Sequence, residues 1–140
     1  KAPRRVMKVS DGYYCAPQVF YFRPQKKWYL ICQASNDAWT PKYQSAFATT
    51  ETLGDVNSWT KLQPLGMQPG EEKKMGLDFW IICDETHAYL FFTSLDGKMW
   101  RMATKLADFP AGWGEAKTGA WSEKSQPPWV TSRVFTPRMA

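Results

Sequence analysis

One acidic side chain stands apart from the other carboxylates of this chain by its sequence context. Asp78 directly precedes Phe79-Trp80-Ile81-Ile82, an apolar run typical of a strand covered on both faces. An ionised carboxylate beside such a strand needs partners, because burying an unpaired charge is costly. Asp78 is therefore the candidate for chemistry. The alternative interpretation is an Asp at a strand edge that is hydrogen-bonded to a turn.

The other polar residue types indicate no site of their own. His87 is the only histidine and lies in a charged turn with Asp84 and Glu85, so we expect these side chains at the surface. The cysteines are odd in number and show no C-x-x-C spacing, which favours buried free thiols over a metal or redox site. They are Cys15, Cys32 and Cys83.

The absence of other motifs leaves carbohydrate chemistry as the main candidate. The sequence contains no Gly-rich phosphate loop, no nucleophile elbow and no Ser/His/Asp order. Cleavage of sugars needs only two or three carboxylates and aromatic walls, and its commonest forms need no cofactor. Aromatic residues make up 16% of the chain, which suits such walls and wide sheet surfaces equally well.

Charge and hydropathy exclude two classes of partner. The net charge is +5, but the basic residues are scattered and form no patch or aromatic-basic motif, so we expect no nucleic-acid binding. No apolar run reaches the length of a transmembrane helix and no signal-peptide pattern is visible, so we expect no membrane partner.

The elements that must position Asp78 occur twice. Residues 16–32 and 76–92 share one hairpin pattern at a constant offset of 60, which places Val19 on Phe79 and Asp78 on Gln18. Residues 43–49 then match 98–104 at an offset of 55, and Trp59 matches Trp113. Strand-built repeats of about 40–60 residues are typical of propeller blades. In a propeller the innermost strand of each blade begins near the central channel, so Asp78 would point into it.

The repeats predict an all-β fold with two blades. The blade-like repeats cover about residues 13–62 and 75–121 of a partial propeller domain, 1–124, and residues 125–140 form an irregular tail. A closed propeller needs at least four blades. Either the chain is part of a larger protein or the propeller interpretation is wrong.

Several segments resemble glycoside hydrolase family 62. The similarity is most specific in residues 76–101, extends over 16–33 and 47–59, and continues from Leu106-Ala107-Asp108-Phe109-Pro110 to about Trp121. The resemblance implies a five-bladed β-propeller and a secreted, extracellular α-L-arabinofuranosidase. Such enzymes remove arabinose side groups from arabinoxylan and invert the anomeric carbon.

The resemblance also implies site residues. The family uses a general-base Asp, a general-acid Glu and a further Asp that holds the sugar and raises the pKa of the acid. Asp78 matches the third of these. Gln33 falls in a segment that contributes to the sugar pocket, although the aromatic residue often found beside it is here Ala34. Leu77 would line the same pocket.

The chain departs from the family at the two other carboxylates. The resemblance places the general base upstream of Lys1 and the general acid in a Phe-Glu-like step near Trp129, which is here followed by Val130. An inverting pair is held roughly 6.5–9.5 Å apart across the sugar. With neither member present, we expect the chain alone to be inactive.

The resemblance implies partners as well. The substrate would be arabinoxylan or an arabino-oligosaccharide, and the complete protein would be a monomer. No cofactor would be required and no metal ligands are visible, although the family often holds a calcium ion at the propeller axis of the full-length protein. Two alternatives are a non-catalytic carbohydrate-binding propeller fragment and a family-43-like glycosidase.

Overall fold

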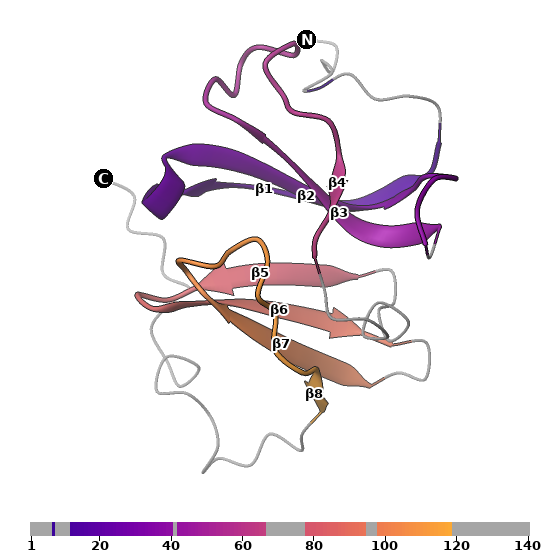
Figure 1. Cartoon of the computed structure of the whole chain (residues 1–140), viewed down its shortest axis with the longest axis vertical. Coiled ribbons are helices and arrows are strands. Elements are labelled where there is room, and N and C mark those ends of the chain that lie inside the picture. Colours follow the sequence, from indigo (N-terminus) through magenta and orange to yellow (C-terminus); the bar gives the residue numbers. More distant parts are fainter. Residues whose placement is uncertain (1–6, 8–11, 41, 67–77, 95–97, 119–140) are drawn as a thin grey trace, which may run out of the picture.

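The chain folds into two four-stranded antiparallel sheets that face one another (Figure 1). The computed structural model describes residues 7, 12–40, 42–66, 78–94 and 98–118. The irregular tail predicted at 125–140 lies outside these residues. Strands are the only regular elements of the described residues apart from one 3₁₀ turn, so the all-β prediction is confirmed. No described helix is long and apolar enough to cross a membrane.

Each sheet is built from consecutive strands in chain order. The first sheet consists of β1 (Tyr14–Phe22), β2 (Lys27–Ser35), β3 (Tyr43–Thr50) and β4 (Gln63–Pro64). The second consists of β5 (Phe79–Cys83), β6 (His87–Thr93), β7 (Met99–Lys105) and β8 (Lys117–Thr118). The sequence repeat is thus a repeat of one four-stranded unit.

The two hairpins do not follow a uniform offset. Leu30 pairs with Val19 in the first hairpin, so a shift of 60 would pair Leu90 with Phe79. Leu90 instead pairs with Ile81. The second hairpin is therefore displaced by two residues, an even number that leaves every side chain on the same face of the sheet.

This displacement corrects the predicted equivalence of Asp78 and Gln18. Gln18 pairs with Ile31, whereas Asp78 lies opposite Thr93, whose backbone N–H donates to the Asp78 carbonyl at 3.3 Å. Because Thr93 is the counterpart of Gln33, the backbone position of Asp78 corresponds to that of Cys15, which pairs with Gln33. Asp78 lies nearer the beginning of its strand than Gln18 does.

The third strands are also offset differently from the prediction. Leu30 pairs with Ala48 and Leu90 pairs with Met102, so β7 follows β3 by 54 residues rather than 55. The same offset of 54 relates Trp59 to Trp113.

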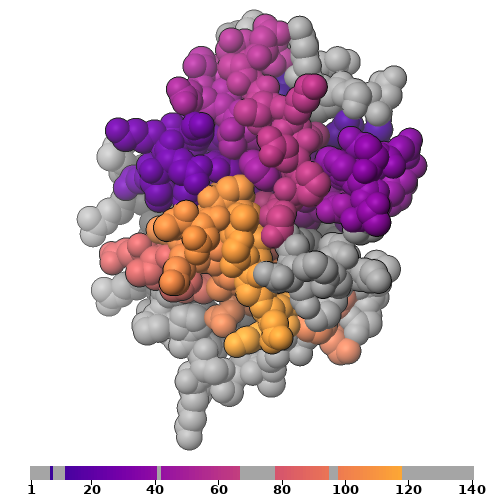
Figure 2. All heavy atoms as spheres, in the orientation of Figure 1, coloured from indigo at the N-terminus to yellow at the C-terminus, as the bar shows by residue number. Residues whose placement is uncertain are grey.

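The hydrophobic core lies between the two sheets and is filled from both. Alternate residues of β6 (Ala88, Leu90 and Phe92) face Tyr29 and Ile31 of β2 across it. The loop after β7 closes the core with two large side chains, Phe109 and Trp113, both at most 2% exposed. In Figure 2 the orange segment that contains this loop lies directly against the first sheet. The two sheets therefore form a single packed unit.

Candidate carbohydrate site

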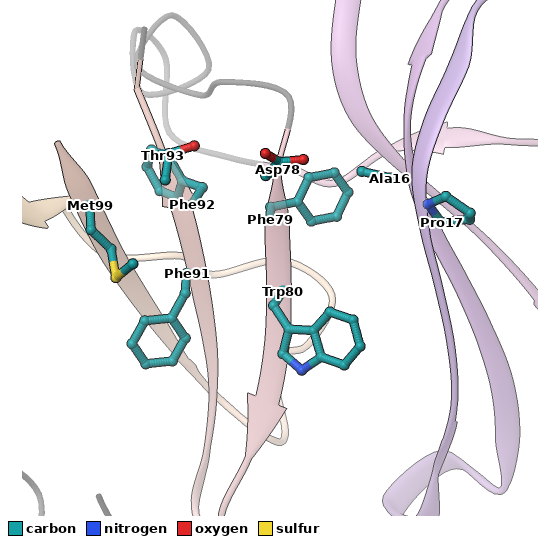
Figure 3. A pocket seen from close by; sticks show the side chains of 9 residues that line it. All are labelled: Ala16, Pro17, Asp78, Phe79, Trp80, Phe91, Phe92, Thr93 and Met99. Atoms are coloured by element: carbon teal, nitrogen blue, oxygen red, sulfur yellow. The ribbon is translucent and has the colours of Figure 1, made fainter. Parts of the chain in front are cut away.

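Asp78 lies at the beginning of β5 and its side chain is exposed (Figure 3). Its backbone carbonyl is held by Thr93, as described above. Among the described residues, none forms a hydrogen bond or an ion pair with its carboxylate, so the interpretation as a turn-bonded Asp finds no support there. No described residue therefore competes with a ligand's hydroxyl groups for the Asp78 carboxylate.

Asp78 borders a hollow of about 400 Å³ whose other walls are mostly apolar. Aromatic rings from β5 and β6 and the Met99 side chain of β7 form one side, and β1 forms the other (Figure 3). The lining residues are Ala16, Pro17, Asp78, Phe79, Trp80, Phe91, Phe92, Thr93 and Met99. Apolar rings beside one hydrogen-bonding carboxylate can hold a polyhydroxylated ring, which has apolar faces and a polar edge.

An irregularity in β1 brings two residues to this hollow. The register of β1 shifts between Cys15 and Gln18, and Ala16 has a positive φ of 48°. Bulges of this kind bend a strand and re-aim its side chains. Ala16 and Pro17 line the hollow, and the Phe79 ring points toward them (Figure 3).

Of the predicted site residues that the structure describes, Asp78 lines the hollow and Gln33 does not. Gln33 is buried in β2, where the Cys15 thiol donates to its Oε1 at 3.3 Å, and it does not line the hollow. Leu77 lies outside the described residues. Gln33 nonetheless lies at the same end of the first hairpin as the hollow, because its strand partner Cys15 directly precedes the lining residue Ala16. The roles of Asp78, Gln33 and Leu77 stay predictions.

A buried glutamine next to the site was not found from the sequence. Gln18 Nε2 donates to the Ile81 carbonyl at 2.9 Å, and the Ile81 N–H donates to Gln18 Oε1 at 2.8 Å. Ile81 belongs to β5, the strand that Asp78 precedes. The only sequence signal was a polar residue before an apolar strand.

The charged hairpin turn has a structural role. Partial burial acts to raise the pKa of Asp84, but hydrogen bonds from the N–H groups of Thr86 and His87 and from the Tyr89 hydroxyl outweigh it and lower the pKa to about 2. The His87 ring bonds to the Thr86 hydroxyl at 2.8 Å. These residues close the turn between β5 and β6, away from the hollow.

The three cysteines are free thiols, as predicted. Cys32 is buried. Its burial, and to a smaller extent the nearby Cys15, raise the pKa of its thiol to about 11, which makes the thiol inert at neutral pH. Cys15 is half-buried. The prediction of burial is wrong for Cys83, which is exposed near the end of β5.

Metal centres are typically formed by clusters of ligating side chains. The described residues contain no group of three or more His, Cys, Asp or Glu side chains that could hold an ion. A calcium ion takes six to eight oxygen ligands.

Comparisons with known proteins agree on one family. The model of glycosyl hydrolase family 62 matches residues 5–138. Alpha-L-arabinofuranosidase C of Cellvibrio japonicus (strain Ueda107) is 42% identical over 111 residues, which is 79% of this chain and 16% of that protein.

Solved structures give the same result. The catalytic domain of the Coprinopsis cinerea family-62 α-L-arabinofuranosidase matches with a TM-score of 0.63 and 32% identity, over 77% of this chain and 33% of that one. A family-62 hydrolase solved in complex with xylotriose matches with a TM-score of 0.62 and 31% identity, over 77% of this chain and 34% of that one. The chain thus spans about one third of the solved domains, and its two sheets are part of a five-bladed β-propeller.

Proposed function

The chain belongs to glycosyl hydrolase family 62, and on this premise we propose that it is part of an α-L-arabinofuranosidase acting on arabinoxylan. The enzyme removes arabinofuranosyl side groups from the xylan chain and inverts the anomeric carbon. The family match replaces the family-43-like alternative. The relative solved with xylotriose supports a xylan-type substrate.

The observation that carries this proposal is the position of Asp78. Its exposed carboxylate begins the first strand of the second sheet, beside a hollow with aromatic walls, and has no partner among the described residues. A carboxylate in that setting can accept hydrogen bonds from sugar hydroxyls. Gln33 and Leu77 are proposed to contribute to the same sugar pocket.

The proposed reaction needs two further carboxyl groups. A general base activates water on one face of the sugar, while a general acid protonates the leaving oxygen on the other. The negative charge of Asp78 disfavours ionisation of a nearby acid and so keeps that acid protonated at the pH of the reaction. The resemblance assigns the base to a segment upstream of Lys1 and the acid to a Phe-Glu-like step near Trp129, where this chain has Val130 instead. Residues 1–140 alone should therefore release no arabinose.

The proposal extends to the whole protein. It is secreted, works as a monomer and requires no cofactor. The calcium ion that the resemblance implies at the propeller axis of the full-length protein stays a prediction.

The test is replacement of Asp78 in the longest protein that the gene encodes. Asp78→Asn keeps the shape of the side chain but removes its charge, so release of free arabinose from arabinoxylan should fall by about 100-fold or more. Glu85→Gln removes an exposed carboxylate from the turn at the far end of β5 and should leave the rate unchanged.

Two results would contradict the proposal. Arabinose release by Asp78→Asn at the unsubstituted rate would exclude Asp78 from the reaction. A protein that binds arabinoxylan but releases no arabinose would support the non-catalytic carbohydrate-binding alternative.

A further inference from the structure

We propose that Gln18 is a positioning residue, whose side-chain amide fixes β5 against the first sheet and thereby sets the place of Asp78. The proposal rests on the role proposed for Asp78. Gln18 itself is 7% exposed and does not line the hollow, so it would act through the strand rather than on the sugar.

The bridge between Gln18 and Ile81 imitates strand pairing. β5 is the edge strand of the second sheet, so one side of its backbone has no neighbouring strand. The Gln18 amide fills that place at Ile81, accepting from its N–H at 2.8 Å and donating to its carbonyl at 2.9 Å. Without the amide, a buried N–H and a buried carbonyl would lose their partners, which is unfavourable.

Only an amide side chain can make this bridge at every pH. The Ile81 peptide group presents one donor and one acceptor, and a glutamine amide offers the complementary acceptor and donor in one plane. A carboxylate could accept from the N–H but would face the carbonyl without a proton to donate. A leucine of similar size could do neither.

The same short segment of β1 serves the hollow and the bridge. Ala16 and Pro17 line the hollow beside Asp78, and Gln18 reaches Ile81, three residues further along β5. Three residues of strand span about 10 Å. Gln18 therefore links the segment of β1 that lines the hollow to β5, the strand that follows Asp78.

A loose β5 would be costly for catalysis. Among the described contacts, the backbone of Asp78 itself is held by the 3.3 Å bond from Thr93, which is long for a hydrogen bond. Misplacement of a catalytic group by about 1 Å can lower a rate by about 100-fold. The bridge at Ile81 joins this part of β5 to the first sheet by directional hydrogen bonds, in addition to the packing of Phe79 and Ile81 in the shared core.

The first experiment compares two glutamines that both join the sheets. Gln25 Nε2 donates to the Phe109 carbonyl at 2.8 Å, in the loop after β7 and away from the hollow. In amide NMR spectra of the full chain, Gln18→Leu should shift the Asp78 and Ile81 signals and speed hydrogen exchange at Ile81 by at least tenfold. Gln25→Leu should leave both residues unchanged. Asp78 and Ile81 signals unaltered in Gln18→Leu would overturn the proposal.

The second experiment uses pH to make and break the bridge within one protein. Burial raises the pKa of a carboxyl group introduced by Gln18→Glu, and its protonated form can both donate and accept. The wild-type Ile81 and Asp78 signals should therefore return at low pH and be lost as the pH rises. This variant also gives a result if Gln18→Leu does not fold. Signals that do not respond to pH would overturn the proposal.

Activity of the longest encoded protein separates the two proposals. If Asp78→Asn is inactive, Gln18→Leu should lower kcat by about 10-fold or more. As the pH rises, Gln18→Glu should lose activity at a lower pH than the wild type does. A Gln18→Leu rate within twofold of wild type, with Asp78→Asn inactive, would overturn the role of Gln18 alone. An active Asp78→Asn would overturn the function proposed for Asp78 and, with it, the role of Gln18.

Discussion

The two tryptophans related by the repeat have different surroundings. Trp113 is fully buried, and its indole N–H donates to the carbonyls of Leu65 at 3.2 Å and Pro110 at 2.8 Å. Trp59 packs beside Leu62 on the other side of the first sheet. Its buried N–H has no acceptor among the described residues. Of these two tryptophans, Trp113 is the one that fills the core between the sheets and hydrogen-bonds across it.

Replacement of Trp113 should therefore destabilise the fold. Trp113→Phe removes both hydrogen bonds and leaves a cavity, so the free energy of unfolding should fall by about 2–3 kcal/mol. Urea denaturation followed by circular dichroism measures the change. Trp80→Phe is the control, because Trp80 is 55% exposed and its replacement should cost less than about 0.5 kcal/mol. Equal effects of the two changes would show that Trp113 does not hold the sheets together.

The pKa of Asp84 predicts how the stability of the fold depends on pH. Its pKa is about 2 in the folded chain, below the ordinary value, so its stabilising contribution is complete above that ordinary value and is lost as the pH falls toward 2. The midpoint of urea unfolding should fall more steeply between pH 4 and pH 2 in the wild type than in Asp84→Asn. Identical slopes would mean that the turn does not stabilise the ionised carboxylate.

At the scale of elements, the long strands could be predicted from the sequence but their exact register could not. Apolar runs such as Phe79–Ile82 indicate strands, and the repeat indicates that both sets form the same unit. A displacement of two residues leaves the alternation of faces intact, so no pattern of hydrophobicity reveals it. The two-residue strands β4 and β8 carry no periodicity at all.

The candidate site, too, could be predicted from the sequence only in part. Asp78 could be found because a lone carboxylate before an apolar strand is unusual in its immediate context. The partner of Gln18 could not, because Ile81 is 63 positions away and contributes only backbone atoms, which every residue has. Three lining side chains come from three different strands: the rings of Trp80 and Phe91 and the thioether of Met99. They come together at the hollow only after these strands have paired.

The loop after β7 depends on one glycine. Gly112 has a φ of +70°, and a Cβ there would lie 2.9 Å from Asp108 Cβ and 3.0 Å from Thr104 Oγ1. Gly112→Ala should lower the free energy of unfolding by more than about 1 kcal/mol. Gly54→Ala should be nearly neutral, because no atom of the described residues beyond its two chain neighbours lies within 4 Å of a Cβ at that position. Thermal unfolding of the two variants provides the comparison, and a neutral Gly112→Ala would contradict the geometry of this loop.

At the scale of the whole molecule, one face of the second sheet remains apolar and accessible. Trp80 is 55% exposed and Met99 is 53% exposed, and both border the hollow. Trp80 alternates along β5 with the buried Phe79 and Ile81, so it lies on the face of the sheet away from the core. Clustered apolar side chains of this kind mark surfaces that associate. Such a face on an isolated chain favours contact with other copies.

We therefore expect residues 1–140 alone to self-associate. The mass measured by light scattering should rise above 16.1 kDa with protein concentration, and Trp80→Gln should reduce the rise. Tyr43→Gln is the matched control, since Tyr43 is 53% exposed on β3 of the first sheet. A constant 16.1 kDa at all concentrations would contradict the expectation.

The shared core also has a consequence for synthesis on the ribosome. The first sheet is translated before any of the side chains that cover its aromatic face, and that cover is complete only when Trp113 has emerged. Until then the layer opposite Phe22 and Tyr29 is incomplete, so the nascent first sheet has little reason to persist by itself. Folding of this chain is expected to be delayed until both halves have left the exit tunnel, and during that interval a chaperone can bind the uncovered rings.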